Sequence, residues 1–128
     1  MKTKILVIDD VSAIRQMMGA LLGNAGYDVL TAATVEEAVK IADQSQPDLM
    51  VVDVRMGDHN GLQVAVRERA RGRTIPIIVM SGHNDPVLVA EAERLGATFL
   101  LKPFDPDHLL ARVEWLLRQQ ERERPDHQ

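Results

Sequence analysis

The chain has 128 residues, which suits a single domain with a substantial hydrophobic core. Apolar residues make up 45% and aromatic residues only 3%, so aliphatic side chains and methionine must build that core. With 15 Lys and Arg against 19 Asp and Glu, the net charge of −4 removes the electrostatic basis for direct nucleic-acid binding. The absence of cysteine excludes disulfides and thiolate metal sites. No apolar leader or membrane-spanning segment is recognisable, and we expect a cytoplasmic protein without membrane contact.

Five short apolar runs alternate with longer stretches of helical period, which predicts repeated strand-helix units and a parallel sheet. We expect strands over residues 4–9, 28–32, 49–53, 75–81 and 98–101. The first, third and fourth are almost entirely apolar, so they should be central strands covered on both faces. The second is more polar, as expected of an edge strand.

The segments between these runs predict five helices. The first follows Ser12, a suitable N-cap, and places Met17 and Met18 on its apolar side, where we expect core packing. The others are expected over 36–45, 61–71, 86–95 and 107–120. Because the last helix passes into a charged segment, we expect a domain over 1–120 and a charged C-terminal tail over 121–128.

Acidic residues follow two of the apolar strands at the point where each strand ends. Asp9 and Asp10 follow the first strand, and Asp53 ends the third. The carboxyl ends of neighbouring parallel strands gather at the edge where such folds place their ligand crevice. Three carboxylates so close together repel one another unless a cation lies between them, and oxygen ligands suit a hard ion. The sequence therefore predicts a Mg²⁺ site, with Mn²⁺ as the alternative ion.

Two further polar residues, Ser81 and Lys102, follow the fourth and fifth strands. By residue type, the Asp53 carboxylate can attack a phosphoryl phosphorus and form an acyl phosphate. The cation and Lys102 would place positive charge where the transferred group's oxygens are negative. The Ser81 hydroxyl can donate a hydrogen bond to one of those oxygens.

The order Asp9-Asp10, Asp53, Ser81 and Lys102-Pro103, spread over five strand-helix units, resembles the receiver domain of two-component response regulators. The resemblance runs from Lys4 to about Leu117. It implies an α/β fold, the flavodoxin-like (βα)5 three-layer sandwich, with a five-stranded parallel sheet of order 2-1-3-4-5.

The resemblance also implies a role for each pocket residue. Asp53 would accept a phosphoryl group from the phosphohistidine of a histidine kinase or histidine phosphotransfer protein. Asp10, Asp53 and the backbone carbonyl of Arg55 would bind Mg²⁺, with Asp9 acting through water. Lys102 would pair with the phosphoryl group and Ser81 would move toward it.

Phe99 matches the family's aromatic switch position, three residues before the lysine. The output would be binding of a downstream protein or a fused output domain through the fourth helix, fifth strand and fifth helix, residues 86–117. Such a protein promotes its own phosphotransfer and dephosphorylation and is not a turnover enzyme on external substrates. The tail is compatible both with a stand-alone receiver and with a linker to an output domain.

Two positions depart from the family pattern. Met56-Gly57 stands where Met-Pro is usual, and Asn60-Gly61 stands where Asp-Gly is usual. Gly57 should loosen its loop, because glycine leaves more backbone conformations open than proline does. Asn60 remains a competent N-cap. We therefore expect these two departures to change reaction rates without loss of function.

Arg55 and His83 lie two residues past Asp53 and Ser81. Both are by default solvated surface residues. As a hypothesis, they control how water reaches the phosphorus, because a bulky charge can block that water and a proton acceptor can orient it.

Three other functions remain as alternatives. A Mg²⁺-dependent phosphohydrolase would use similar groups, but Arg55 stands where a second acid-base aspartate would be expected. A flavodoxin-like cofactor binder is disfavoured because the loop after the first strand begins Asp9-Asp10, whose charge would repel a nucleotide phosphate. A receiver-like scaffold that is never phosphorylated is disfavoured by the complete pocket.

Overall fold

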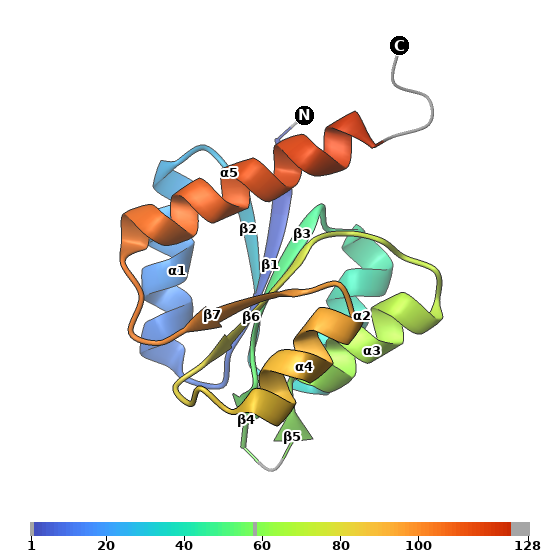
Figure 1. Cartoon of the computed structure of the whole chain (residues 1–128). Coiled ribbons are helices and arrows are strands. Elements are labelled where there is room, and N and C mark those ends of the chain that lie inside the picture. Colours follow the sequence, from blue (N-terminus) through green and yellow to red (C-terminus); the bar gives the residue numbers. More distant parts are fainter. Residues whose placement is uncertain (1, 58, 124–128) are drawn as a thin grey trace.

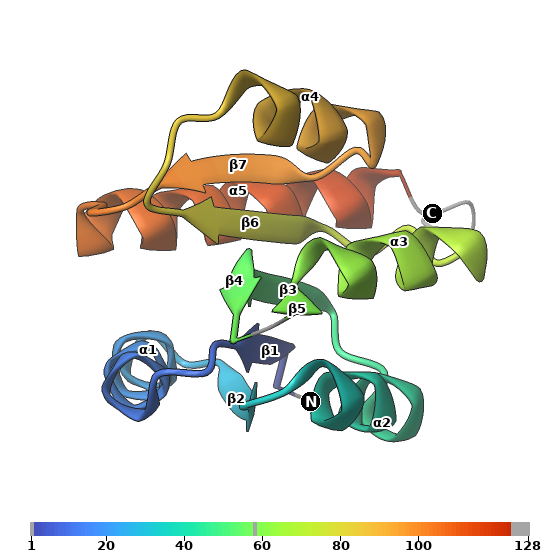
Figure 2. The same cartoon turned by 90° about the horizontal axis from the view of Figure 1, so that it is seen from below.

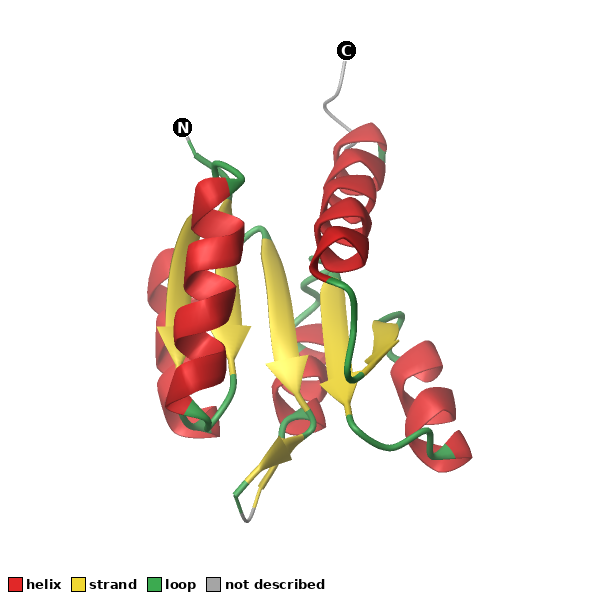
Figure 3. Cartoon of the chain, turned by 90° about the vertical axis from the view of Figure 1, so that its left-hand side faces the viewer, coloured by secondary structure: helices red, strands yellow, loops and turns green. Residues whose placement is uncertain are grey.

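The computed structural model describes residues 2–57 and 59–123. Its main sheet consists of β1 (Lys4–Ile8), β2 (Asp28–Ala32), β3 (Leu49–Asp53), β6 (Ile77–Ser81) and β7 (Thr98–Leu101). All neighbouring pairs are parallel, and the spatial order is β2-β1-β3-β6-β7. This is the expected order 2-1-3-4-5, with two short extra strands taking the intermediate numbers. Figure 3 shows the strands with their arrowheads toward the same edge of the sheet.

Helices cover both faces of the sheet, as Figures 1 and 2 show. The helices are α1 (Ser12–Asn24), α2 (Val35–Ser45), α3 (Leu62–Ala70), α4 (Pro86–Arg94) and α5 (Pro106–Arg122). Side chains that alternate along β1 divide the core between the faces: Ile5 packs with Met18 of α1 and Leu109 of α5. Leu6 packs instead in the cluster that includes residues of α2 and α3. The result is the expected three-layer α/β sandwich.

The three apolar strands are central, as their composition predicted, and all their residues except Lys4 at the start of β1 are buried. Every residue of β3 and β6 is buried, including Asp53 and Ser81 at their ends. The more polar β2 lies at one edge. Continuous apolar runs therefore identified the interior of the sheet, because only a strand covered on both faces is apolar at every position.

The helices α2, α4 and α5 have side-chain N-caps, whereas α1 and α3 do not. Thr34, Asp85 and Asp105 accept hydrogen bonds from the first turns of α2, α4 and α5. The prediction that Ser12 is an N-cap is wrong, because Ser12 is already the first residue of α1 and Val11 is its N-cap, without a side-chain cap. The Asp9 carboxylate accepts the Val11 N–H at 2.9 Å and thereby orders this loop. Asn60 accepts the N–H of Leu62 at 2.8 Å, although the N-cap position itself is Gly61.

The packing of α1 also differs from its pattern. Met18 is buried, whereas Met17 is 45% exposed, so the prediction of core packing for Met17 is wrong. A helix on a sheet buries only a narrow stripe, and residues beside that stripe remain in solvent.

A short antiparallel hairpin follows β3. It is formed by β4 (Arg55–Met56) and β5 (His59–Asn60) and projects beyond the carboxyl edge of the main sheet (Figure 3). Two-residue strands leave no periodic pattern, so the sequence did not predict them. The hairpin returns the chain to Gly61, where a Cβ would collide with the backbone carbonyl oxygen of Asp53 and lie 2.7 Å from Val52 Cγ1. Gly61 therefore permits close contact between the start of α3 and the end of β3.

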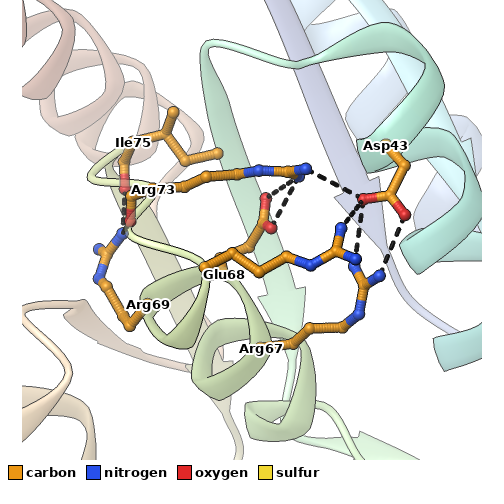
Figure 4. Close-up of polar contacts among 7 residues, drawn as sticks. Asp43, Arg67, Glu68, Arg69, Arg73 and Ile75 are labelled. Carbon is orange, nitrogen blue, oxygen red and sulfur yellow. Dashed lines mark hydrogen bonds and ion pairs between the residues drawn. The ribbon is translucent and has the colours of Figure 1, made fainter.

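A charged cluster joins α2, α3 and the loop before β6, as Figure 4 shows. Its residues come from the C-terminal parts of these helices and from the segment that leads into β6, so it lies at the amino ends of the strands, opposite the carboxyl edge. The Asp43 carboxylate accepts hydrogen bonds from Arg67, Arg71 and Arg73 over 2.8–3.2 Å. Arg73 also pairs at 3.0 Å with Glu68, whose side chain is buried. Hydrogen bonding to Arg67, with the charges of the neighbouring arginines, lowers the pKa of Asp43 to about 2.

The last helix runs to Arg122, two residues beyond the expected end of the domain. Of the tail expected over 121–128, residues 124–128 lie outside the described residues. Within the part of the chain that the structure describes, no helix is long and apolar enough to span a membrane.

Candidate functional site

The three predicted acidic residues meet at the carboxyl edge of the sheet. Asp9 follows β1, Asp53 ends β3, and Asp10 lies in the loop between β1 and α1. Each offers a carboxylate oxygen, and these oxygens lie within 4.8 Å of one another. Asp9 is fully buried and Asp53 is 7% exposed, whereas Asp10 is open to solvent. The arrangement is a half-buried acidic cluster that could hold a metal ion.

Lys102 is the amine that faces this cluster. It follows β7, and its backbone N–H donates to the Ser81 carbonyl at 2.8 Å, which continues the β6–β7 pairing to this edge. Its Nζ lies 3.2 Å from Asp53 Oδ1 and 3.6 Å from Asp9 Oδ2. One ammonium group is therefore shared between two buried carboxylates.

The buried charges are incompletely compensated. Burial raises the pKa of Asp53 above its ordinary value, and repulsion from Asp9 raises it further, against the lowering effect of Lys102. Asp9 Oδ2 is buried without a hydrogen-bond partner among the described residues, since Lys102 Nζ is too distant for one. Buried carboxylate oxygens are normally hydrogen-bonded, and one without a protein partner suits a water or an ion. Chemistry and geometry thus both fit a hard cation.

Two backbone contacts fix the loop that carries the paired acids. Arg15 of α1 donates to the Asp9 carbonyl at 2.8 Å, and the Gly57 N–H donates to Asp10 Oδ2 at 3.0 Å. Sequence reasoning found neither contact. Arg15 has no distinguishing spacing, and the Gly57 contact depends on the unpredicted hairpin.

Ser81 is buried at the end of β6, beside the cluster, but its hydroxyl is engaged within its own loop. It donates to the His83 carbonyl at 3.3 Å and accepts the His83 N–H at 3.0 Å. His83 itself is exposed. A hydrogen bond from Ser81 to a group on Asp53 would require this local pair to open.

The remaining predicted residues lie at the margins of the site. Arg55 is exposed on β4, one strand of the hairpin beside the cluster. Phe99 is half-buried in β7 and pairs in register with Val79 of β6. The structure therefore brings together the three aspartates and Lys102, with Ser81 adjacent, and places Phe99 farther along the sheet.

The model of the response regulator receiver domain family matches residues 5–114. The chain belongs to this family. It is a receiver domain of the response regulators of two-component systems. The fold, the order of the strands and the acidic cluster at the carboxyl edge agree with this assignment.

Curated relatives share the domain over most of its length. The chain is 36% identical over 122 residues to the alkaline phosphatase synthesis transcriptional regulatory protein PhoP of Bacillus subtilis, covering 94% of this chain and 51% of that protein. It is 37% identical over 121 residues to the transcriptional regulatory protein FixJ of Bradyrhizobium diazoefficiens, covering 94% and 59%. It is 30% identical over 110 residues to sporulation initiation phosphotransferase F of B. subtilis, covering 85% and 89%. The chain thus spans about half the length of the transcriptional regulators that it matches.

Solved structures show the same fold. The chemotaxis protein CheY4 of Vibrio cholerae superposes with a TM-score of 0.82 at 34% identity, covering 91% of this chain and 99% of that chain. A CheY-like receiver domain protein from Methanospirillum hungatei superposes with a TM-score of 0.91 at 25% identity, covering 97% and 100%.

Proposed function

We propose that this receiver domain is activated by phosphorylation of Asp53. In the reaction, an Asp53 carboxylate oxygen attacks the phosphorus of a phosphohistidine on a histidine kinase or histidine phosphotransfer protein. The O–P bond forms as the P–N bond breaks, and the imidazole leaves with the bonding electron pair and takes up a proton. The observation that carries the proposal is the Asp53 carboxylate itself, which is buried among two other acids and lies 3.2 Å from the Lys102 amine.

The proposed cation is Mg²⁺, held by Asp10, Asp53 and the backbone carbonyl of Arg55, with Asp9 acting through water. When bound, it supplies positive charge near the phosphoryl oxygens. The unpartnered Oδ2 of Asp9 and the mutual approach of the three carboxylates support this assignment. Mn²⁺ has similar ligand preferences and is the alternative ion.

Lys102 and Ser81 would act on the transferred group. Lys102 already pairs with Asp53 and, after phosphorylation, would pair with a phosphoryl oxygen. Ser81 would release its contact with the His83 backbone and donate its hydroxyl hydrogen to another oxygen. Because Ser81 and Lys102 end neighbouring strands, their movement would act directly on β6, β7 and the loops that follow.

The consequence would be a shift in a pre-existing equilibrium between two surface shapes. The surface would comprise α4, β7 and α5, with Phe99 changing orientation as Ser81 moves. Its partner would be a downstream protein or a fused output domain, and the chain would not turn over external substrates. The transcriptional regulators among its relatives support an output of this kind.

Arg55 and His83 are proposed to set the lifetime of the phosphoryl group. Both are exposed next to the site, on the hairpin and on the loop after β6. Replacing both with alanine should change the first-order rate of phosphate loss, measured by intact mass after removal of the donor. An unchanged lifetime would refute this role while leaving the phosphorylation itself untouched.

The decisive experiment is incubation with acetyl phosphate, with and without Mg²⁺, followed by intact mass measurement. The wild type should gain one phosphoryl mass only when Mg²⁺ is present. Asp53→Asn, which keeps the side-chain size and removes the nucleophile, should gain none. An equal gain by both proteins would show that Asp53 is not the acceptor.

A further inference from the structure

The β4–β5 hairpin, which follows β3, contributes a backbone hydrogen-bond donor to the acidic cluster. Gly57 begins the connection between β4 and β5, and its N–H donates to Asp10 Oδ2 at 3.0 Å. The base of the hairpin is closed by a backbone hydrogen bond from Gly61 N–H to the Val54 carbonyl at 2.7 Å, and Val54 N–H donates to the Met80 carbonyl of β6 at 2.9 Å. The donor is thus attached through the hairpin to the central strands β3 and β6.

Asp10 needs such a contact more than the other two acids do. Asp9 and Asp53 are buried, so packing restricts their side chains, and each lies within ion-pair distance of Lys102. Asp10 is exposed, and among the described residues its carboxylate receives a hydrogen bond from Gly57. An exposed carboxylate without a fixed partner samples several rotamers, and ordering it on binding an ion costs side-chain entropy.

We propose that the Gly57 N–H is a positioning group for the cation site, and that the β4–β5 hairpin and cation binding at Asp10 are thereby coupled. The inference rests on the proposed function, since it concerns the same cation. A carboxylate has about four lone-pair positions, so Asp10 can accept the Gly57 N–H and still face the ion. Groups that orient a metal ligand in this way commonly change metal affinity by about 10- to 100-fold when removed.

The contact between Gly57 and Asp10 depends on the glycine at this position, because of its backbone conformation. Its φ is +61°, a left-handed conformation that glycine adopts freely, asparagine tolerates and proline cannot adopt. Proline also lacks the N–H. Gly57 therefore supplies a donor that a proline at this position would remove, which is a different consequence from the looser loop expected from the sequence.

The test is calorimetric titration of the unphosphorylated protein with Mg²⁺, in the absence of any phosphodonor. Gly57→Pro should bind Mg²⁺ about 10-fold more weakly than the wild type, because Asp10 loses its fixed orientation. Gly57→Asn keeps both the donor and the left-handed turn and should bind nearly as tightly as the wild type. In the wild type, Mg²⁺ should also slow hydrogen exchange of the Gly57 amide.

A third variant separates the donor from the shape of the loop. Gly57→Ala keeps the N–H but disfavours the left-handed backbone, and it should lose less affinity than Gly57→Pro. Equal losses of Mg²⁺ affinity in the alanine and proline variants, or no loss in the proline variant, would overturn the inference. If the wild type still bound Mg²⁺, the cation site itself would remain supported. A wild type that binds no Mg²⁺ would refute the cation site and this inference with it. Melting temperatures without Mg²⁺ would show whether each variant remains folded.

Discussion

The two charged regions at opposite edges of the sheet differ in how their charges are matched. At the amino edge, one carboxylate, Asp43, accepts hydrogen bonds from three arginines, and its pKa is lowered to about 2. At the carboxyl edge, three aspartates face Lys102, and the pKa of Asp53 is raised. The Asp43 carboxylate has its hydrogen-bond partners within the chain, whereas in the second region the buried Oδ2 of Asp9 has none among the described residues. Incompletely compensated buried charges of this kind are typical of functional sites, which supports the proposed role of the carboxyl edge.

Gly61→Ala should produce the largest effect, because it breaks the frame of the carboxyl edge. The new Cβ would collide with the Asp53 carbonyl, which is backbone and cannot move aside cheaply. We expect a loss of unfolding free energy of about 3 kcal/mol, measured by urea denaturation.

Gly19→Ala is the matched control for this substitution. Gly19 lies inside α1, where an added Cβ meets nothing within 4 Å. Alanine there should stabilise the protein by about 0.5–1 kcal/mol. Equal effects of the two substitutions would show that the close approach at Gly61 is unimportant.

Lys102→Met should have the next largest effect, since it removes the amine that two buried carboxylates share. Loss of one partner from a buried ion pair lowers the free energy of unfolding by up to about 3–5 kcal/mol. Because Lys102 is partly exposed, we expect a loss of about 2 kcal/mol. Added Mg²⁺ should recover part of this loss, because it supplies the missing charge. Melting with and without Mg²⁺ checks the prediction, and a variant that melts like the wild type would contradict it.

Asp53→Asn should have a smaller effect of opposite sign. The pKa of Asp53 is raised in the folded state. Its favourable contribution to the free energy of unfolding is therefore complete only at a pH below its pKa in the unfolded state, and is lost as the pH rises through the folded-state pKa. Near neutral pH the ionised carboxylate therefore destabilises the fold, and asparagine should add about 0.5–2 kcal/mol. The gain should shrink as the pH falls toward 3.8. A destabilised Asp53→Asn at neutral pH would show that Lys102 compensates the charge fully.

Asp43→Asn should have the smallest effect, a modest fall in melting temperature without loss of phosphorylation. The lowered pKa means that the contribution of Asp43 is present above 3.8 and is lost as the pH falls toward about 2. The difference between wild type and variant should accordingly disappear over that interval and decrease with added salt. A variant that fails to gain the phosphoryl group would show that the two edges are coupled.

The sequence predicted the main sheet, its helices and the acidic cluster, because each depends on a strong local signal. Apolar runs identify β1, β3 and β6, and an aspartate directly after such a run, as with Asp53, has little structural reason to be there. The hairpin, the close approach of Gly61 and the Gly57 contact were not predicted. They depend on short backbone contacts between segments, which leave no periodicity in the sequence.

Reductive localisation of the phosphoryl group tests the central claim most directly. Borohydride converts an aspartyl phosphate to homoserine, so treating the protein after incubation with acetyl phosphate and Mg²⁺ marks the acceptor for peptide mass spectrometry. We predict homoserine at residue 53, and none in a sample prepared without Mg²⁺. Homoserine at another position, or a phosphoryl group that resists reduction, would contradict the assignment of the uncompensated carboxylate cluster as the acceptor site.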